Sequence, residues 1–222
     1  MHPKARKFAK YCEQHFDLEK PDTFYLYRSL PICLVDCVYS LRTKYSSVTL
    51  PLVQRYADAY LGGDKTAEGD TLSQFLQHVE EAGGPKRFAD RVLNNHQKLG
   101  GKAGVPKEEV CCQLARYLRA LHIETLEDFR VFPEPEVLEI VIRAVKGMGH
   151  AGCSYLFMLT GDCSRCKPDV HIHHCIRDAL GQDLADVDCQ RLFEDAARIL
   201  QEAHPALSVR SLDGAIWEAY RA

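Results

Sequence analysis

The sequence predicts an all-α fold of about ten helices, and three observations favour this class. Apolar residues recur at intervals of three and four along much of the chain, which is the spacing of a helix face that packs on a core. Alternating apolar and polar runs joined by hairpin turns are nearly absent. Of the 222 residues, 46% are hydrophobic and 27% are charged, a balance that excludes disordered and fibrous classes.

Each expected helix is identified by its apolar face. The faces, in chain order, are Leu72, Phe75, Leu76 and Val79; Val110, Leu114, Tyr117, Leu118 and Leu121; Val137, Ile140, Val141 and Ala144; Cys153, Leu156, Phe157 and Thr160; and Leu192, Phe193, Ala196 and Leu200. Asp70 or Thr71 is expected to cap the first of these helices, and Thr125 with Asp128 resembles a capping box. The run 47–50 is the one β-branched strand candidate.

Clusters of glycine separate the expected helices at residues 62–63, 83–84, 100–104 and 147–149. We expect a boundary between two lobes near the third cluster. Because the connections are too short for freely jointed domains, residues 1–222 are expected to form a single two-lobed helical domain.

The net charge of −3 does not indicate a nucleic-acid-binding protein, so a role on DNA must rest on local basic patches. No stretch approaches the roughly 20 apolar residues of a membrane span, and no apolar run follows the basic residues at the start, as a secretory signal requires. A cytosolic or nuclear location is therefore expected. There, the ten cysteines are thiols or metal ligands rather than disulfides.

The segment with the clearest chemical pattern is a helix, a tight turn and a second helix. The turn reads Lys146, Gly147, Met148, Gly149 and His150. Its glycines permit positive φ and leave backbone N–H groups uncovered, so the turn can bind a phosphate at the start of the second helix. An ordinary corner between two helices is the alternative.

An aspartate follows this turn at a sequence spacing that allows a functional role. Asp169 stands twenty residues after Gly149 and directly after Pro168, which favours a helix start. An aspartate in that position is either a helix cap or a carboxylate that points into a cleft.

Residues 134–181, with this turn and Asp169, resemble the helix–hairpin–helix (HhH-GPD) DNA glycosylase superfamily. The family's hairpin corresponds to residues 145–149, and its catalytic aspartate corresponds to Asp169. A weaker similarity extends to residues 30–60, 107–129 and 211–217. The resemblance implies a two-lobed helical fold that acts as a monomer on double-stranded DNA, in the cytoplasm or nucleoid, or in the nucleus of a eukaryote.

Three positions depart from the family pattern. Lys146 replaces the usual proline of the hairpin, and Ala151 stands where bifunctional members carry a Schiff-base lysine. Only Cys175 and Cys189 follow Asp169, whereas an iron–sulfur cluster needs four cysteines. Neither lyase chemistry nor that cluster is therefore implied, and no cofactor is expected. The family's strand-wedging residue falls near Arg42.

Two basic segments are candidates for DNA contact, since phosphate neutralisation dominates affinity for duplex DNA. A solvated surface is the alternative. The first segment contains Lys86, Arg87, Arg91, Lys98, Lys102 and Lys107 with one acid, Asp90. The second contains Lys146, His150, Arg165, Lys167, His173 and His174, and His171 matches a histidine of the family.

The base pocket and a metal site are less defined by the sequence. Tyr39, Tyr45 and Tyr155 are candidates to stack on a flipped base, although an aromatic at helical spacing often belongs to the core. Cys163 and Cys166, with histidines nearby, have the ligand types of a zinc site, and reduced thiols are the alternative.

Three functions are compatible with these patterns. The first is a monofunctional DNA glycosylase of base-excision repair, in which Asp169 stabilises the sugar cation and activates water. The second is a catalytically inactive helix–hairpin–helix protein with a DNA-binding or accessory role. The third is a regulatory module that holds zinc at the Cys/His cluster.

Overall fold

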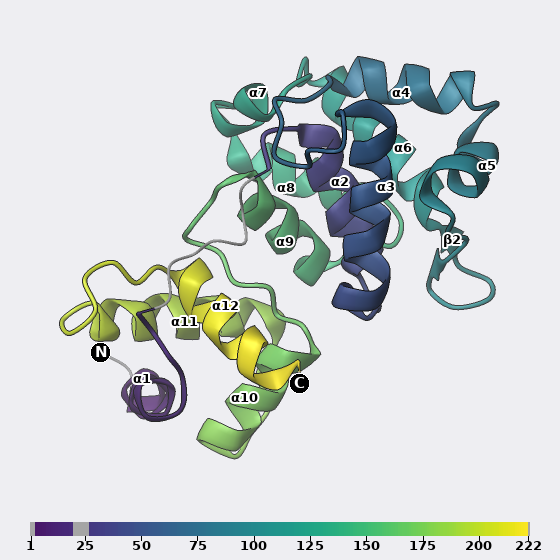
Figure 1. Ribbon diagram of the computed structural model, residues 1–222. Helices are drawn as coiled ribbons and strands as arrows, with labels where there is room; N and C mark the ends of the chain where they lie inside the picture. The colour runs from purple at the N-terminus through teal and green to yellow at the C-terminus, as the bar shows by residue number, and fades with distance from the viewer. Residues whose placement is uncertain (1–2, 20–26, 222) are drawn as a thin grey trace. The chain divides into compact units, whose positions relative to one another are not determined.

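The computed structural model describes residues 3–19 and 27–221, and within them the fold is all-α, as expected (Figure 1). The one sheet in this part of the chain is a two-stranded hairpin. The chain divides into two compact units: unit 1 comprises Met1–Tyr25 with Gly161–Ala222, and unit 2 comprises Leu26–Thr160. No helix in the described ranges is both long and apolar enough to span a membrane.

Unit 1 is a group of four described helices around one apolar core. They are α1 (Pro3–His15), α10 (Val170–Leu180), α11 (Asp186–Leu200) and α12 (Val209–Tyr220). Helix α1 packs on α11, where the rings of Phe8 and Phe193 lie 5.2 Å apart, and α10 packs on α12. The expected face of α11 is buried here, which confirms that prediction.

Unit 2 contains the remaining helices and the hairpin. They are α2 (Leu30–Ser40), η1 (Tyr45–Thr49), α3 (Leu50–Tyr60), α4 (Leu72–Glu81), α5 (Pro85–Phe88), η2 (Ala89–Leu93), β1 (Lys98–Leu99), β2 (Val105–Pro106), α6 (Lys107–Ala120), α7 (Leu126–Arg130), α8 (Pro135–Ala144) and α9 (His150–Thr160). Both η elements are π-helical. All eleven residues of α2 are buried, because α3, α4, α6 and α9 pack around it.

Three expectations about unit 2 are wrong. Residues 47–50 form no strand: they end η1 and begin α3, where Pro51 is tolerated in the first turn of a helix. The buried residues of α8 are Leu138 and Ile142, and Ile140 is 69% exposed. Tyr117 is likewise exposed on α6. By contrast, the predicted faces of α4 and α9 are buried, and the caps at Thr71 and Thr125 are present.

The expected lobe boundary at residues 100–104 is also wrong. These residues form the tip of the β1–β2 hairpin within unit 2, and the boundaries lie at Tyr25–Leu26 and Thr160–Gly161. Gly100 and Gly101 both have positive φ, so this glycine cluster makes a tight turn rather than a linker.

Candidate nucleic-acid interface

The helix–turn–helix expected in unit 2 is present between α8 and α9. The turn covers residues 145–149, with Val145 and Met148 buried and Lys146 exposed. Gly147 has a φ of 103°, and a Cβ there would lie 2.9 Å from Leu99 Cδ1. Gly149 is not among the positive-φ glycines, and a Cβ on it would meet nothing within 4 Å. Both glycines permit positive φ, and of the two Gly147 adopts it.

Two other segments of unit 2 pack here, one on the turn and one on the start of α9. Leu99 of β1 packs where Gly147 lacks a side chain. Leu41, just after α2, reaches to 3.2 Å from the Cβ position of Gly152 in α9. The exposed cations on these three segments are here called the basic surface: Arg42, Lys44, Lys98, Lys102 and Lys146.

The basic surface draws its charge from parts of the chain that lack acids. Residues 37–57, 91–107 and 140–161 contain nine of the 28 lysines and arginines and none of the 31 acidic residues. No ion pair joins any of the five cations to an acid within the described ranges. Positive charge is therefore concentrated at the α8–α9 turn of an acidic protein, a distribution that attracts polyanions.

Lys107 was expected among the DNA contacts, and the structure corrects this. Its side chain is buried, and its ammonium donates to Tyr39 O at 3.0 Å, Leu41 O at 2.9 Å, Thr43 Oγ1 at 2.7 Å and Gln97 Oε1 at 3.0 Å. These oxygens belong to the end of α2, the loop after it and the residue before β1. Lys107 therefore joins two of the three segments that form the basic surface.

Two of the three aromatic candidates for a base pocket, Tyr39 and Tyr155, are core residues in this structure, and Tyr45 is half-buried. Tyr39 is fully buried, and Tyr155 is 8% exposed. The hydroxyls of Tyr27, Tyr45 and Tyr155 donate to the buried carboxylate of Asp36 at 2.8, 2.8 and 3.0 Å. Burial and this carboxylate raise the pKa of the Tyr45 hydroxyl. Neither Tyr39 nor Tyr155 presents a ring face to a base here, which corrects that expectation.

Asp169 lies in unit 1, where it is the N-cap of α10. One carboxylate oxygen, Oδ1, accepts from the backbone N–H of His171 at 2.9 Å and of Ile172 at 3.4 Å. Its Oδ2 lies 3.8 Å from Lys167 Nζ, and its side chain is 21% exposed. The cap holds the carboxylate in one orientation, with part of it open to solvent.

The residues of the second basic segment are divided between the two units. Lys146 and His150 belong to unit 2, and the other four residues belong to unit 1. Arg165 is 3.2 Å from Asp162, and His173 is 3.1 Å from Asp186, so each already has an acidic partner. Lys167 is the cation found beside Asp169.

Cys163 and Cys166 do not share a surface. Cys163 is exposed, whereas Cys166 is buried in the core of unit 1, where burial raises the pKa of its thiol. A raised thiol pKa opposes the thiolate that zinc requires. No group of three or more metal-ligating side chains is placed to hold an ion within residues 3–19 and 27–221.

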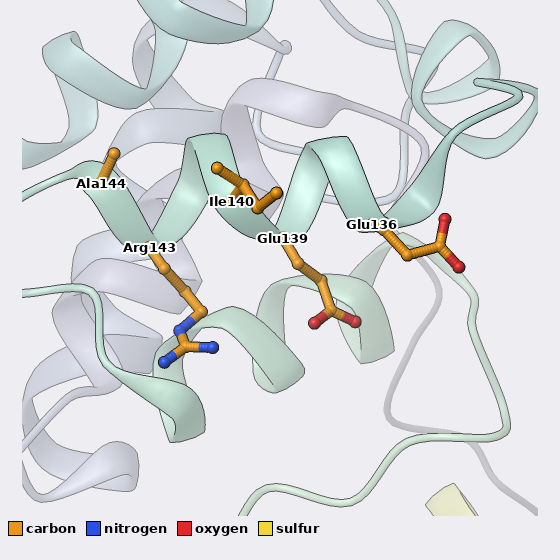
Figure 2. A pocket seen from close by; sticks show the side chains of 5 residues that line it. All are labelled: Glu136, Glu139, Ile140, Arg143 and Ala144. Atoms are coloured by element: carbon orange, nitrogen blue, oxygen red, sulfur yellow. The ribbon is translucent and has the colours of Figure 1, made fainter.

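An open hollow of about 470 Å³ lies along the exposed side of α8 (Figure 2). It is lined by Glu136, Glu139, Ile140, Arg143 and Ala144. Figure 2 shows that all five side chains come from this one helix. Such a surface hollow, with two carboxylates, does not provide the enclosed, stacking environment that holds a flipped base.

Two polar residues of unit 2, Asp36 and Lys107, have buried structural roles that the sequence patterns above do not predict. Asp36 is the single acid in the otherwise apolar run 30–39, and a lone acid within a buried helix needs several donors. That signal could have identified it. Lys107 follows Pro106 at a helix start, a pattern that is equally common on surfaces, and no feature of the sequence marks it as buried.

Comparison with known proteins gives one match. A family model described as Domain of unknown function (DUF8548) matches residues 6–221. No curated protein and no solved structure matches the chain.

Proposed function

The chain belongs to the family described as Domain of unknown function (DUF8548), and we propose that it is a monofunctional DNA glycosylase of base-excision repair. The observation that carries the proposal is the basic surface at the α8–α9 turn. The resemblance of residues 134–181 to helix–hairpin–helix glycosylases supplies the reaction class. The alternative is a DNA-binding protein of the same type without catalysis.

DNA contact is supported by the charge and the backbone of the turn. Five exposed cations of the basic surface have no acidic partner in the described part of unit 2. Gly149 leaves open space before the first turn of α9, where backbone N–H groups of a helix start can bind a phosphate. Contacts of this kind position a duplex without reading its sequence.

The proposed chemistry centres on Asp169. Flipping a nucleotide costs a few kcal/mol, and cleavage of its glycosidic bond develops positive charge on the sugar. An oriented carboxylate stabilises that charge and activates water. Ala151 offers no amine at the position of a Schiff-base lysine, so water is the attacking group and the product is an intact strand with an abasic site.

Two observations favour the non-catalytic alternative. Asp169 already serves as a helix cap and has Lys167 beside it. Two of the three tyrosines expected to line a base pocket, Tyr39 and Tyr155, are buried. Each is compatible with a protein that keeps the DNA-binding turn and lacks excision.

The test is single-turnover excision from duplex oligonucleotides that carry alkylated, deaminated, oxidised or mismatched bases. We expect release of at least one class of base, and Asp169→Asn should lower that rate by orders of magnitude, because the neutral amide cannot stabilise the cation. Asparagine is an equally good N-cap, so the variant should stay folded and bind DNA with unchanged affinity.

Borohydride added during the reaction should trap no protein–DNA adduct. Equal rates for wild type and Asp169→Asn would remove Asp169 from the mechanism. DNA binding without release of any base would establish the non-catalytic alternative.

A further inference from the structure

The β1–β2 hairpin has a tip that is open to solvent, and every residue of this tip except Lys102 is glycine or alanine. Lys98 pairs with Pro106 and Leu99 pairs with Val105, and residues 100–104 join the strands. Gly100 and Gly101 have positive φ, and a Cβ on Gly104 would overlap the carbonyl oxygen of Leu99. The tip extends from the helices of unit 2 (Figure 1). Its glycines therefore expose backbone that can approach another molecule closely.

The base of the hairpin is held firmly in unit 2. Leu99 is buried against Gly147. The backbone N–H of Lys107 donates to Gln97 O at 2.9 Å, and its ammonium donates to Gln97 Oε1. The Leu99 contact places the base of the hairpin beside the α8–α9 turn, and the bonds to Lys107 hold it to the start of α6.

The hairpin carries two lysines without acidic neighbours in its own sequence. Lys98 and Lys102 are exposed, and the Lys98 ammonium contacts only a backbone oxygen, Lys102 O, at 3.4 Å among the described polar contacts. The nearest acids along the chain on either side are Asp90, which is 2.9 Å from His96, and Glu108, which is buried at the start of α6. Both ammonium groups are therefore available to an anionic ligand.

We propose that, within the basic surface, the β1–β2 hairpin itself binds phosphates of duplex DNA, in addition to the phosphate contact of the α8–α9 turn. This rests on the proposed DNA-binding function. A lipid surface is less suited to the hairpin, because membrane-binding segments insert large apolar side chains and the tip offers only Ala103. A protein interface is less suited for the same reason, since its core requires aromatic or apolar contacts.

The experiment measures the salt dependence of binding to an undamaged duplex oligonucleotide for the whole protein. The variant is Lys98→Gln with Lys102→Gln, and the matched control is Lys65→Gln with Arg116→Gln, two cations of unit 2 that lie outside the basic surface and outside both basic segments. If both lysines bind phosphates, the slope of log K against log salt should become less negative by about 1.8, with a loss of on the order of tenfold per lysine near 0.1 M salt. The control slope should not change.

The possible failures are distinguishable. If wild type binds no duplex, the proposed function itself fails. If wild type binds and the hairpin variant retains its slope, DNA binding stands and the hairpin proposal is overturned. Vesicles of phosphatidylcholine with phosphatidylserine provide a further arm: binding to them that depends on Lys98 and Lys102, with no such dependence on DNA, would assign the hairpin to lipid instead.

Discussion

The buried ammonium of Lys107 is tolerated because oxygen atoms surround it. Two of them, Tyr39 O and Leu41 O, belong to the end of α2, where the helix dipole places partial negative charge. The side chains of Thr43 and Gln97 supply the other two. Lys107, which the sequence suggests as a DNA contact, therefore connects the segments that carry Arg42 and Lys98.

Replacing Lys107 by methionine tests that role. Methionine has a similar length but donates no hydrogen bond, so the four oxygens lose a shared donor in a buried place. We expect the free energy of unfolding to fall by about 3 kcal/mol, measured by urea denaturation. The control is Lys102→Met on the exposed hairpin tip, which should change stability by less than about 0.5 kcal/mol. Equal stability of the Lys107 variant and wild type would show that the buried ammonium does not stabilise the contact between these loops.

At the scale of the elements, periodicity and capping rules were sufficient to predict a helix and its buried face where a single face of that helix packs on the core. The apolar face of α4 and its Thr71 cap followed from spacing alone. The strand predicted at residues 47–50 is wrong because β-branched residues also occur in helices. The Val48 N–H donates to Lys44 O rather than to a neighbouring strand. On α8, apolar residues lie on more than one side, so periodicity could not select Leu138 and Ile142 over Ile140.

The α8–α9 turn allows a test that separates folding from binding. Valine at Gly149 meets open space, whereas valine at Gly147 requires an unfavourable φ and displaces Leu99. We expect Gly149→Val to keep its melting temperature and to weaken binding to all DNA sequences alike, because the side chain occupies the path of a phosphate. Gly147→Val should lose both stability and affinity. Unchanged affinity in a folded Gly149→Val protein would make the turn an ordinary helix corner.

At the scale of the whole molecule, two features of the candidate site could be predicted from the sequence and two could not. The helix–turn–helix and the cap position of Asp169 both followed from glycine, proline and spacing. The sequence did not predict that the turn and Asp169 belong to different compact units, because this division depends on contacts between residues distant in sequence. The net charge of −3 likewise conceals the segregation of cations into three segments that meet only after folding.

The location of the DNA interface is the central claim, and amide hydrogen exchange with and without a duplex oligonucleotide tests it most directly. Bound DNA should slow exchange in residues 41–44, 98–104 and 146–152 of unit 2, which carry the basic surface, and should leave the exposed amides of α4 unchanged. Protection of α4 with none in those three segments, at DNA concentrations that saturate the protein, would contradict the account.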